Sequence, residues 1–247
     1  MLNLSTICKA ALICLFFINQ RALAQKEAWP VHGEIELSSG FCDYRVAHFH
    51  GGLDIRTGGA EGRKVYSPIT GYVWRIKYAY NGYGKALYLR DADGRIYVFG
   101  HLSRLSDPLE KFVKKHQYEA KRYYLDEEFK PDFFPVKLGD LIAFSGQTGA
   151  GPPHLHFEKR TPNNLPLNPL ANGFSLPDKI PPPIEGVGFI YVDSGALFAN
   201  GKRTNYRPVR LIRGTNRYVL DSAVYLDAPF GLEVKAFDRM SPGGPKL

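Results

Sequence analysis

Cysteine is nearly absent from the part of this chain that is expected to fold. The 247 residues include three cysteines, and Cys8 and Cys14 lie in an N-terminal segment with the features of an export signal. Cys42 then remains alone, so no disulfide within the exported chain can stabilise the fold. We expect this single thiol to be a small buried apolar side chain rather than a ligand or a nucleophile.

The chain also lacks an apolar run long enough to cross a bilayer. Its most apolar stretch, residues 10–18, is shorter than the roughly 20 residues that a membrane-spanning helix needs. The stretch follows Lys9 and precedes Ala22-Leu-Ala24, so residues 1–24 predict a cleaved signal peptide, with an uncleaved anchor as the alternative. We therefore expect export to the periplasm or cell envelope of a Gram-negative bacterium, with no stable membrane anchor after cleavage.

No recognisable nucleic-acid-binding motif is present, and the basic residues are scattered rather than gathered in a stripe. The formal net charge is +8, and it falls to +6 when Lys9 and Arg21 leave with the signal. A basic surface suits an anionic polymer. For an exported protein, cell-wall material or a membrane surface is a better candidate partner than nucleic acid, although simple solubility explains the charge nearly as well.

Turn-forming and aromatic residues are abundant. With 25 Gly, 18 Pro, 16 Phe and 15 Tyr, the composition favours aromatic-rich strands joined by turns over a helical bundle. Residues 71–78, 86–90 and 95–101 are predicted to be strands, and the short turns between them favour antiparallel hairpins. A helix is predicted to begin at Ser106-Asp107-Pro108, because apolar residues then recur on one face and lysines on the other.

The second half of the chain predicts further strands and a change of domain. Residues 141–145 and 154–159 are predicted strands on either side of a glycine-rich loop. Residues 161–183 hold seven prolines and give the clearest linker in the chain. Beyond them, four more strand patterns predict a small all-β unit, which is either packed on the first domain or the start of a truncated β-sandwich. The predicted domains are residues 1–24, 25–170, 171–183 and 184–247, for signal peptide, main β domain, proline-rich linker and all-β accessory unit.

Two short segments supply side chains in a pattern typical of metal sites. His50-Gly-Gly-Leu-Asp54 offers an imidazole and a carboxylate, with glycines that let the backbone approach a crowded centre. His154-Leu-His156 offers two imidazoles on one face of a strand, because side-chain direction repeats every second residue. His101, at the end of an alternating strand, can face the same cavity. Each signal is weak alone, but together they predict a catalytic zinc site, which typically has three protein ligands and one open position.

This pattern resembles the M23 family of zinc metallopeptidases, of the lysostaphin and LytM type. The resemblance covers about residues 40–160 and rests on His50 to Asp54, on Gly100-His101-Leu-Ser103, and on the loop from Gly146 that runs into Pro153-His-Leu-His-Phe-Glu158. It implies a mainly β fold, with a compact antiparallel sheet and one zinc ion (Zn2+) in a groove. The helix-bearing segment at 105–136 exceeds what the compact family core needs, and it resembles the insertions of longer Bacteroidetes-type members.

The resemblance assigns roles to individual residues. His50, Asp54 and His156 are the implied zinc ligands, and His101 and His154 are the implied catalytic histidines that do not bind the metal. The sequence leaves open which of these two histidines is the general base and which stabilises the oxyanion. His48 and Thr148 are candidates for residues that support the ligands from behind or line the groove. For His48, a surface position without a role in the site is an equal alternative.

The implied activity is hydrolysis of peptide cross-links in peptidoglycan by a zinc-activated water. The insertion at 105–136 is expected to wall the groove or to narrow its specificity, and it favours directly cross-linked peptides as substrate. One alternative is a non-catalytic LytM-like module that binds the wall or regulates another hydrolase, but such members are expected to lack ligands and none is missing here. A structural or adhesive surface protein is a third reading, which makes no use of the histidines.

Overall fold

A computed structural model describes residues 27–46, 48–149, 151–177, 180–191, 207–212, 217–220, 223, 225 and 229–238. The predicted signal peptide at 1–24, with Cys8 and Cys14, lies outside these residues. The chain divides into two compact units, Met1–Leu176 and Pro177–Leu247. Within the described ranges, no helix combines the length and apolar character needed to cross a membrane.

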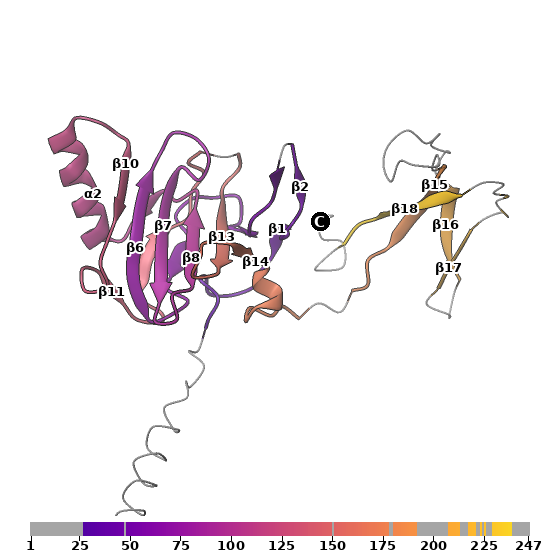
Figure 1. The fold of residues 1–247 in the computed structure, drawn as a ribbon, viewed down its shortest axis with the longest axis horizontal. Coiled ribbons are helices and arrows are strands. Elements are labelled where there is room, and N and C mark those ends of the chain that lie inside the picture. Colours follow the sequence, from indigo (N-terminus) through magenta and orange to yellow (C-terminus); the bar gives the residue numbers. More distant parts are fainter. Residues whose placement is uncertain are drawn as a thin grey trace, which may run out of the picture. The chain divides into compact units, whose positions relative to one another are not determined.

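The first unit is built around one large antiparallel sheet. Its strands among the described residues are β1 (Leu37–Ser39), β4 (Leu53–Arg56), β6 (Gly71–Tyr78), β7 (Lys85–Asp91), β8 (Ile96–Gly100), β10 (Leu125–Glu128), β11 (Pro135–Val136), β13 (His154–Arg160) and β14 (Pro166–Leu167). They follow the order β1-β4-β13-β8-β7-β6-β10, with β14 beside β13 and β11 beside β6 (Figure 1). The strand pairs are antiparallel, so the mainly β fold class with a compact antiparallel sheet is confirmed.

Smaller elements complete this unit. A three-stranded sheet consists of β5 (Lys64–Tyr66), β12 (Leu141–Phe144) and β9 (Arg104–Leu105), in that order. A hairpin of β2 (Tyr44–Arg45) and β3 (His48–Phe49) stands beside the main sheet. Among the described residues of this unit, the helices are α2 (Asp107–Ala120) and the 3-10 turn η1 (Pro169–Ala171).

The core lies around the central strands β7, β8 and β13. As predicted, β6, β7 and β8 follow one another as antiparallel hairpins. However, β8 is buried along its whole length rather than alternating between buried and exposed residues. On one face Ile96 and Val98 join a buried cluster with Tyr88, and on the other Phe99 packs on Phe157 with ring centroids 5.6 Å apart. Each large apolar side chain buried in this way contributes about 1.5–3 kcal/mol.

Helix α2 begins as predicted, with Ser106 as its N-cap residue and a proline in the first turn. Its apolar face buries Leu109 and Val113. His116 is half-buried and lies against the Phe112 ring, with centroids 3.9 Å apart, so it takes no part in the predicted metal site.

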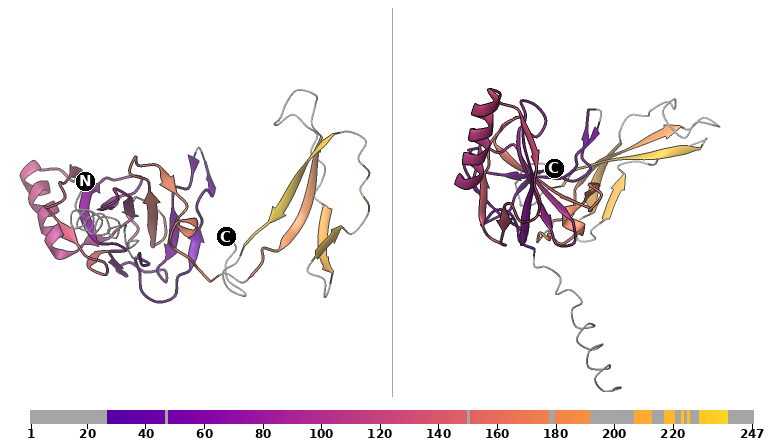
Figure 2. Two further views of the ribbon diagram at one scale, coloured as in Figure 1. Left: turned by 60° about the horizontal axis from the view of Figure 1, so that its bottom comes forward. Right: turned by 60° about the vertical axis from the view of Figure 1, so that its left-hand side comes forward.

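The insertion at 105–136 extends the sheet at the edge away from the predicted metal site. Strands β10 and β11 both pair with β6, whereas the predicted ligands lie at β4 and β13. In both Figure 1 and Figure 2, α2 lies at the opposite end of this unit from the β2–β3 hairpin. The expectation that the insertion walls the groove is therefore wrong, because its strands are paired to the far edge of the sheet.

The proline-rich stretch after β13 is partly folded into the first unit. Strand β14 pairs with β13, and the Asn168 side chain accepts a hydrogen bond from the Leu170 backbone N–H in the η1 turn. Phe174 is buried and packs edge-on against Phe157 and Trp29, with centroid distances of 5.0 and 5.4 Å. The first unit thus continues to Leu176, past residue 170 where the sequence places the start of the linker.

The second unit contains strands at the four segments that the sequence indicates. These are β15 (Ile184–Tyr191), β16 (Arg207–Ile212), β17 (Arg217–Leu220) and β18 (Phe230–Ala236). They form an antiparallel sheet in the order β17-β16-β15-β18.

Candidate metal centre

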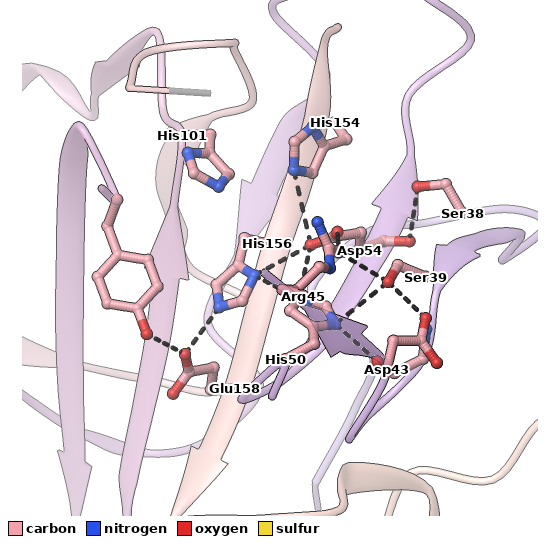
Figure 3. Close-up of polar contacts among 12 residues, drawn as sticks. Ser38, Ser39, Asp43, Arg45, His50, Asp54, His101, His154, His156 and Glu158 are labelled. Atoms are coloured by element: carbon pink, nitrogen blue, oxygen red, sulfur yellow. Dashed lines mark hydrogen bonds and ion pairs between the residues drawn. The ribbon is translucent and has the colours of Figure 1, made fainter. Parts of the chain in front are cut away.

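Three buried side chains converge at one place on the main sheet (Figure 3). Asp54 on β4 and His156 on β13 are direct partners in the antiparallel register, and His50 lies in the loop that leads into β4. The three residues are 7%, 3% and 6% exposed, in that order. Their potential ligand atoms all lie within 4.8 Å of one another. The structure therefore brings together the three residues that the sequence analysis names as zinc ligands.

The donor atoms of these side chains are close enough to surround one cation. Asp54 Oδ1 lies 3.0 Å from His156 Nδ1 and 3.1 Å from His50 Nε2. The two imidazole nitrogens are themselves 3.0 Å apart. Burial alone raises the pKa of Asp54, but hydrogen bonds with His156 and His50 outweigh it and hold the pKa below its ordinary value. The carboxylate is therefore ionised and available as a ligand.

Hydrogen bonds on the outer side of each imidazole select its tautomer. His50 Nδ1 lies 2.6 Å from the carbonyl oxygen of Gly40, which can only accept, so Nδ1 carries the proton and Nε2 presents a lone pair. His156 Nε2 lies 2.7 Å from Glu158 Oε1 and donates to it, which leaves Nδ1 to face Asp54. Partners of this kind orient histidines in metal sites. Two imidazole nitrogens and one carboxylate oxygen make a donor set that fits catalytic zinc.

The proton balance of His156 changes when a metal binds. Burial by itself lowers the pKa of His156, but hydrogen bonds with Asp54 and Glu158 outweigh it and raise the pKa above its ordinary value. Without a metal, the ring can therefore hold a proton on each nitrogen. Because only a lone pair can act as a ligand, His156 Nδ1 would have to lose its proton before it could hold a metal ion.

Glu158 fixes His156 from behind and was assigned no role by the sequence analysis. Its side chain is fully buried and accepts hydrogen bonds from Tyr83 Oη and Arg160 Nε, each at 2.5 Å. Burial raises the pKa of Glu158, but hydrogen bonds with His156 and Arg160 outweigh this and lower it to about 2. The signal was present in the sequence, because a residue two positions after His156 on a strand lies on the same face.

Arg45 holds the second oxygen of Asp54. Its Nη2 donates to Asp54 Oδ2 at 2.9 Å and to Ser39 Oγ at 2.7 Å. Ser39 Oγ in turn donates to Asp43 Oδ2 at 2.6 Å. Because Arg45 occupies Oδ2, Asp54 offers the metal only Oδ1. The chain of contacts ties the β2–β3 hairpin to the metal centre, and nothing in the spacing of the sequence motifs indicated it.

Replacement of Glu158 by glutamine is expected to weaken zinc binding about 10- to 100-fold, the usual cost of losing such a partner. The amide still accepts a hydrogen bond from His156 but carries no charge, and Arg160 loses its ion pair. Competition with a chelator of known affinity measures the change. Glu127→Gln, at an exposed position on β10, is the matched control and should leave the affinity unchanged. Equal affinities in the two variants would contradict the positioning role of Glu158.

The two predicted catalytic histidines lie beside the ligand cluster. His154 Nδ1 is 2.7 Å from the Pro152 carbonyl oxygen, and its Nε2 is 3.6 Å from Asp54 Oδ1. His101 Nδ1 is 2.9 Å from the Thr148 carbonyl oxygen, and its ring centroid is 4.7 Å from that of His154. Each carbonyl oxygen accepts a hydrogen bond from the Nδ1–H of its histidine, so in the neutral ring the lone pair lies on Nε2. Burial lowers the pKa of His101 to about 4, against the opposing effect of its hydrogen bond to Thr148.

The remaining candidates occupy different places. Thr148 lies behind His101, where its hydroxyl donates to the Leu102 carbonyl at 2.8 Å and accepts from the Lys85 backbone N–H at 2.9 Å. His48 is exposed on β3 and lines the groove. Cys42 is exposed, with a φ of 66°, in the turn before β2, so the expectation of a buried thiol is wrong. The turn places this side chain at the surface.

A groove of about 1220 Å³ surrounds the cluster. Its lining comes from the β2–β3 hairpin, the loop at 57–59, the turn at 82–83, the loop at 149–153 and strand β13. No residue of the insertion at 105–136 is among its lining residues in the described part of the chain. The groove thus gives an extended ligand access to the ligand cluster and to both catalytic-histidine candidates.

Gly51 and Gly52, which follow His50, allow the chain to pack closely against strand β13. A Cβ atom on Gly52 would lie 2.3 Å from the backbone oxygen of Phe157 and 2.6 Å from Glu158 Cγ. A Cβ on Gly51 would lie 3.1 Å from Glu158 Oε1. The sequence analysis correctly indicated a crowded centre, but the crowding comes from β13 and its side chains. These contacts let the His50 loop enter β4 directly over Glu158.

Residues 48–121 match the family model described as Peptidase family M23. The resemblance to M23 zinc metallopeptidases stated from the sequence is thereby confirmed for this part of the first unit. Among proteins of known function, the DD-carboxypeptidase/endopeptidase Mpg of Neisseria meningitidis serogroup B is 28% identical over 152 residues. That match covers 60% of this chain and 29% of the relative, so it spans less than a third of the relative's length.

Solved structures give matches over a similar part of the chain. A zinc-containing peptidase from Vibrio cholerae is 25% identical with a TM-score of 0.42, and the match covers 58% of this chain and 39% of that one. A mutant catalytic domain of the prophage-encoded M23 protein EnpA from Enterococcus faecalis is 22% identical with a TM-score of 0.43. The match covers 59% of this chain and 98% of that domain.

Proposed function

We propose that this protein is an exported, zinc-dependent endopeptidase that hydrolyses peptide cross-links of peptidoglycan. The observation that carries the proposal is the convergence of His50, Asp54 and His156, whose donor atoms lie within 4.8 Å of one another in an open groove. The name of the meningococcal relative, a DD-carboxypeptidase/endopeptidase, supports a substrate of this kind. Residues 1–24 support export to the periplasm or cell envelope of a Gram-negative bacterium, where that substrate lies.

The residues of the site have two separate roles in peptide hydrolysis, metal binding and proton transfer. His50, Asp54 and His156 would hold the zinc ion, which would supply a Lewis acid and lower the pKa of water at the site. His154 and His101 each present an Nε2 lone pair, so each can accept a proton from the attacking water. The imidazole that has taken the proton can then donate it to the leaving amine. The low pKa of His101 keeps that ring neutral before the reaction.

The carbonyl oxygens of Pro152 and Thr148 hold the two catalytic imidazoles in place. Each carbonyl oxygen accepts a hydrogen bond from Nδ1–H, with Nδ1 to oxygen distances of 2.7 Å for His154 and 2.9 Å for His101. This fixes both Nε2 atoms before substrate arrives, so no ring has to turn during the reaction. Preorganisation of this kind lowers the barrier because the groups do not reorganise in the transition state.

Isolated peptidoglycan provides the direct test. Mass spectrometry should show loss of cross-linked fragments and release of their peptide products by the zinc-loaded protein. Chelation of zinc should abolish the release, and His154→Ala and His101→Ala should each slow it about 10²- to 10⁴-fold, the usual contribution of acid–base catalysis. Binding to the wall without release of peptide products by a zinc-loaded protein would replace the proposal with the non-catalytic wall-binding module.

A further inference from the structure

Arg56 lies on the groove face of β4, opposite His154 in the strand register. It lies two residues after Asp54 on β4, so both side chains point to the same face of the sheet. Its partner in the antiparallel register is His154, just as the partner of Asp54 is His156. Arg56 is half-buried and is one of the residues that line the groove. The cross-strand pair of Arg56 and His154 is therefore next to the pair of Asp54 and His156 on the same face of the sheet.

Arg56 differs from the other two arginines that line the groove. Arg45 is paired with Asp54 at 2.9 Å, and Arg160 is paired with Glu158 at 2.5 Å. The Arg56 side chain donates only from Nε, to the Leu37 carbonyl oxygen at 3.3 Å. Within the described residues, its two terminal nitrogens have no hydrogen-bond or ion-pair partner. Besides Asp54, the acidic residue that lines the groove in the described part of the chain is Glu36. No ion pair joins Glu36 to Arg56 among the described residues.

We propose that Arg56 forms a subsite for a free carboxylate of the peptide substrate, next to the bond that is cut. The inference rests on the proposed function and narrows its substrate class. The Nε bond to Leu37 fixes the plane of the guanidinium, and the edge formed by the two terminal nitrogens remains available. That edge matches the two oxygens of a carboxylate, which arginine binds through two parallel hydrogen bonds.

The position of Arg56 explains why the ligand is a carboxylate close to the scissile bond. A neutral stretch of peptide gives a guanidinium no charge to neutralise. Arg56 and His154 lie two residues along their strands from Asp54 and His156. A peptide whose carboxylate is bound by Arg56 would therefore have its scissile carbonyl close to the metal ligands. The subsite therefore selects peptides that carry a negative charge within a residue or two of the cleaved bond, and it determines specificity rather than taking part in the proton transfers.

Synthetic cross-linked peptides that differ only in one carboxylate test this subsite. One peptide carries an amide in place of the C-terminal carboxylate. A second peptide carries an amide in place of the free carboxylate on the residue whose side chain forms the cross-link. The wild-type protein should prefer the free carboxylate at one of these positions about 10- to 100-fold in kcat/KM, as expected for a charged hydrogen-bonded pair. Most of this difference should appear in KM.

Variants of Arg56 then assign the preference. Arg56→Gln should bring the ratio between the free and amidated peptides close to one, and Arg56→Lys should keep part of it because the charge remains. Arg122→Gln removes the same charge at an exposed position outside the groove, so it should retain the wild-type ratio. A purely structural role of Arg56 would slow both peptides equally and leave their ratio unchanged, which overturns the inference.

Failure of the inference can be told from failure of the proposed function. Hydrolysis of both peptides at equal rates by the wild type overturns the carboxylate subsite and leaves the peptidase assignment standing. If the zinc-loaded wild type hydrolyses neither peptide, the proposed function fails. Calorimetric binding of the same peptides still tests the subsite, since the free carboxylate should bind the wild type about tenfold more tightly than the amide. Arg56→Gln should bind the two peptides equally.

Discussion

The His156→Ala protein should carry no zinc and should hydrolyse peptidoglycan peptides on the order of a thousandfold more slowly. The substitution removes one of three ligand atoms and also leaves the buried carboxylates of Asp54 and Glu158 without the imidazole between them. A Lewis acid contributes several kcal/mol to stabilising a transition state, which corresponds to a rate factor of this order. Elemental analysis of the purified protein, together with the rate of peptide release, measures both effects.

His48→Ala is the matched control for this prediction. His48 is exposed on β3, and it lines the same groove as the ligands without belonging to the ligand cluster. We expect the variant to keep about one zinc ion per chain, in line with a single three-ligand site. Full zinc content in His156→Ala would show that the metal binds elsewhere. Loss of zinc in His48→Ala would make His48 a supporting residue of the site rather than a surface histidine.

Gly52→Ala should destabilise the first unit by about 3 kcal/mol or more, at the upper end of the cost of overpacking. The added Cβ would lie 2.3 Å from the backbone oxygen of Phe157, and a strand backbone paired on both sides cannot move away as a flexible side chain can. Urea denaturation followed by tryptophan fluorescence measures the change. The chain has two tryptophans, Trp29 and Trp74, and both lie in the first unit, so the signal reports this unit.

Gly151→Ala provides the comparison at a position with space. A Cβ there would meet no atom of the described residues within 4 Å, so the unfolding midpoint should remain close to that of the wild type. Equal midpoints for Gly52→Ala and the wild type would mean that β4 and β13 can separate without cost. A low zinc content in Gly52→Ala is also expected, because the same displacement moves the His50 loop away from Glu158.

The side chains that the structure brings together as candidate ligands could be named from the sequence because short-range rules are enough to find them. The two-residue period of a strand puts His154 and His156 on one face, and the glycines mark a close approach of backbone. The residues that hold the ligands could not be found in this way. Arg45 reaches Asp54 from a separate hairpin, and Gly40 contributes only a carbonyl oxygen, which carries no sequence signal at all.

Strands β4 and β10 are among those that escaped prediction, and each did so for a different physical reason. Strand β4 has four residues, of which three are buried, so it lacks the alternation that marks a half-buried strand. Strand β10 consists of Leu125 followed by three acidic residues, and an ion pair between Arg75 and Asp126 accompanies its pairing with β6. Asp126 accepts hydrogen bonds from Arg75 Nε and Nη2, each at 2.6 Å, across this edge. Cross-strand ion pairs of this kind have no hydrophobic period to detect.

The position of the insertion relative to the groove could not be predicted, because the sequence does not show which strands β10 and β11 pair with. The sequence indicated an insertion at residues 105–136, but the distance of this segment from the groove follows from the pairing of β10 and β11 with β6. The burial of Phe174 against Phe157 is likewise a contact between separate segments of the chain. Contacts that are distant along the chain remain beyond patterns read within short windows.

The pairing of β4 with β13 also determines when the metal centre appears during folding. Asp54 and His156 are separated by 102 positions, whereas β6, β7 and β8 pair through short turns. Contacts between distant segments close large loops and form more slowly than local hairpins. The hairpins can therefore be in place while the ligands are still far apart. Zinc uptake by a refolding chain should lag behind strand formation and coincide with closure of the sheet between β4 and β13.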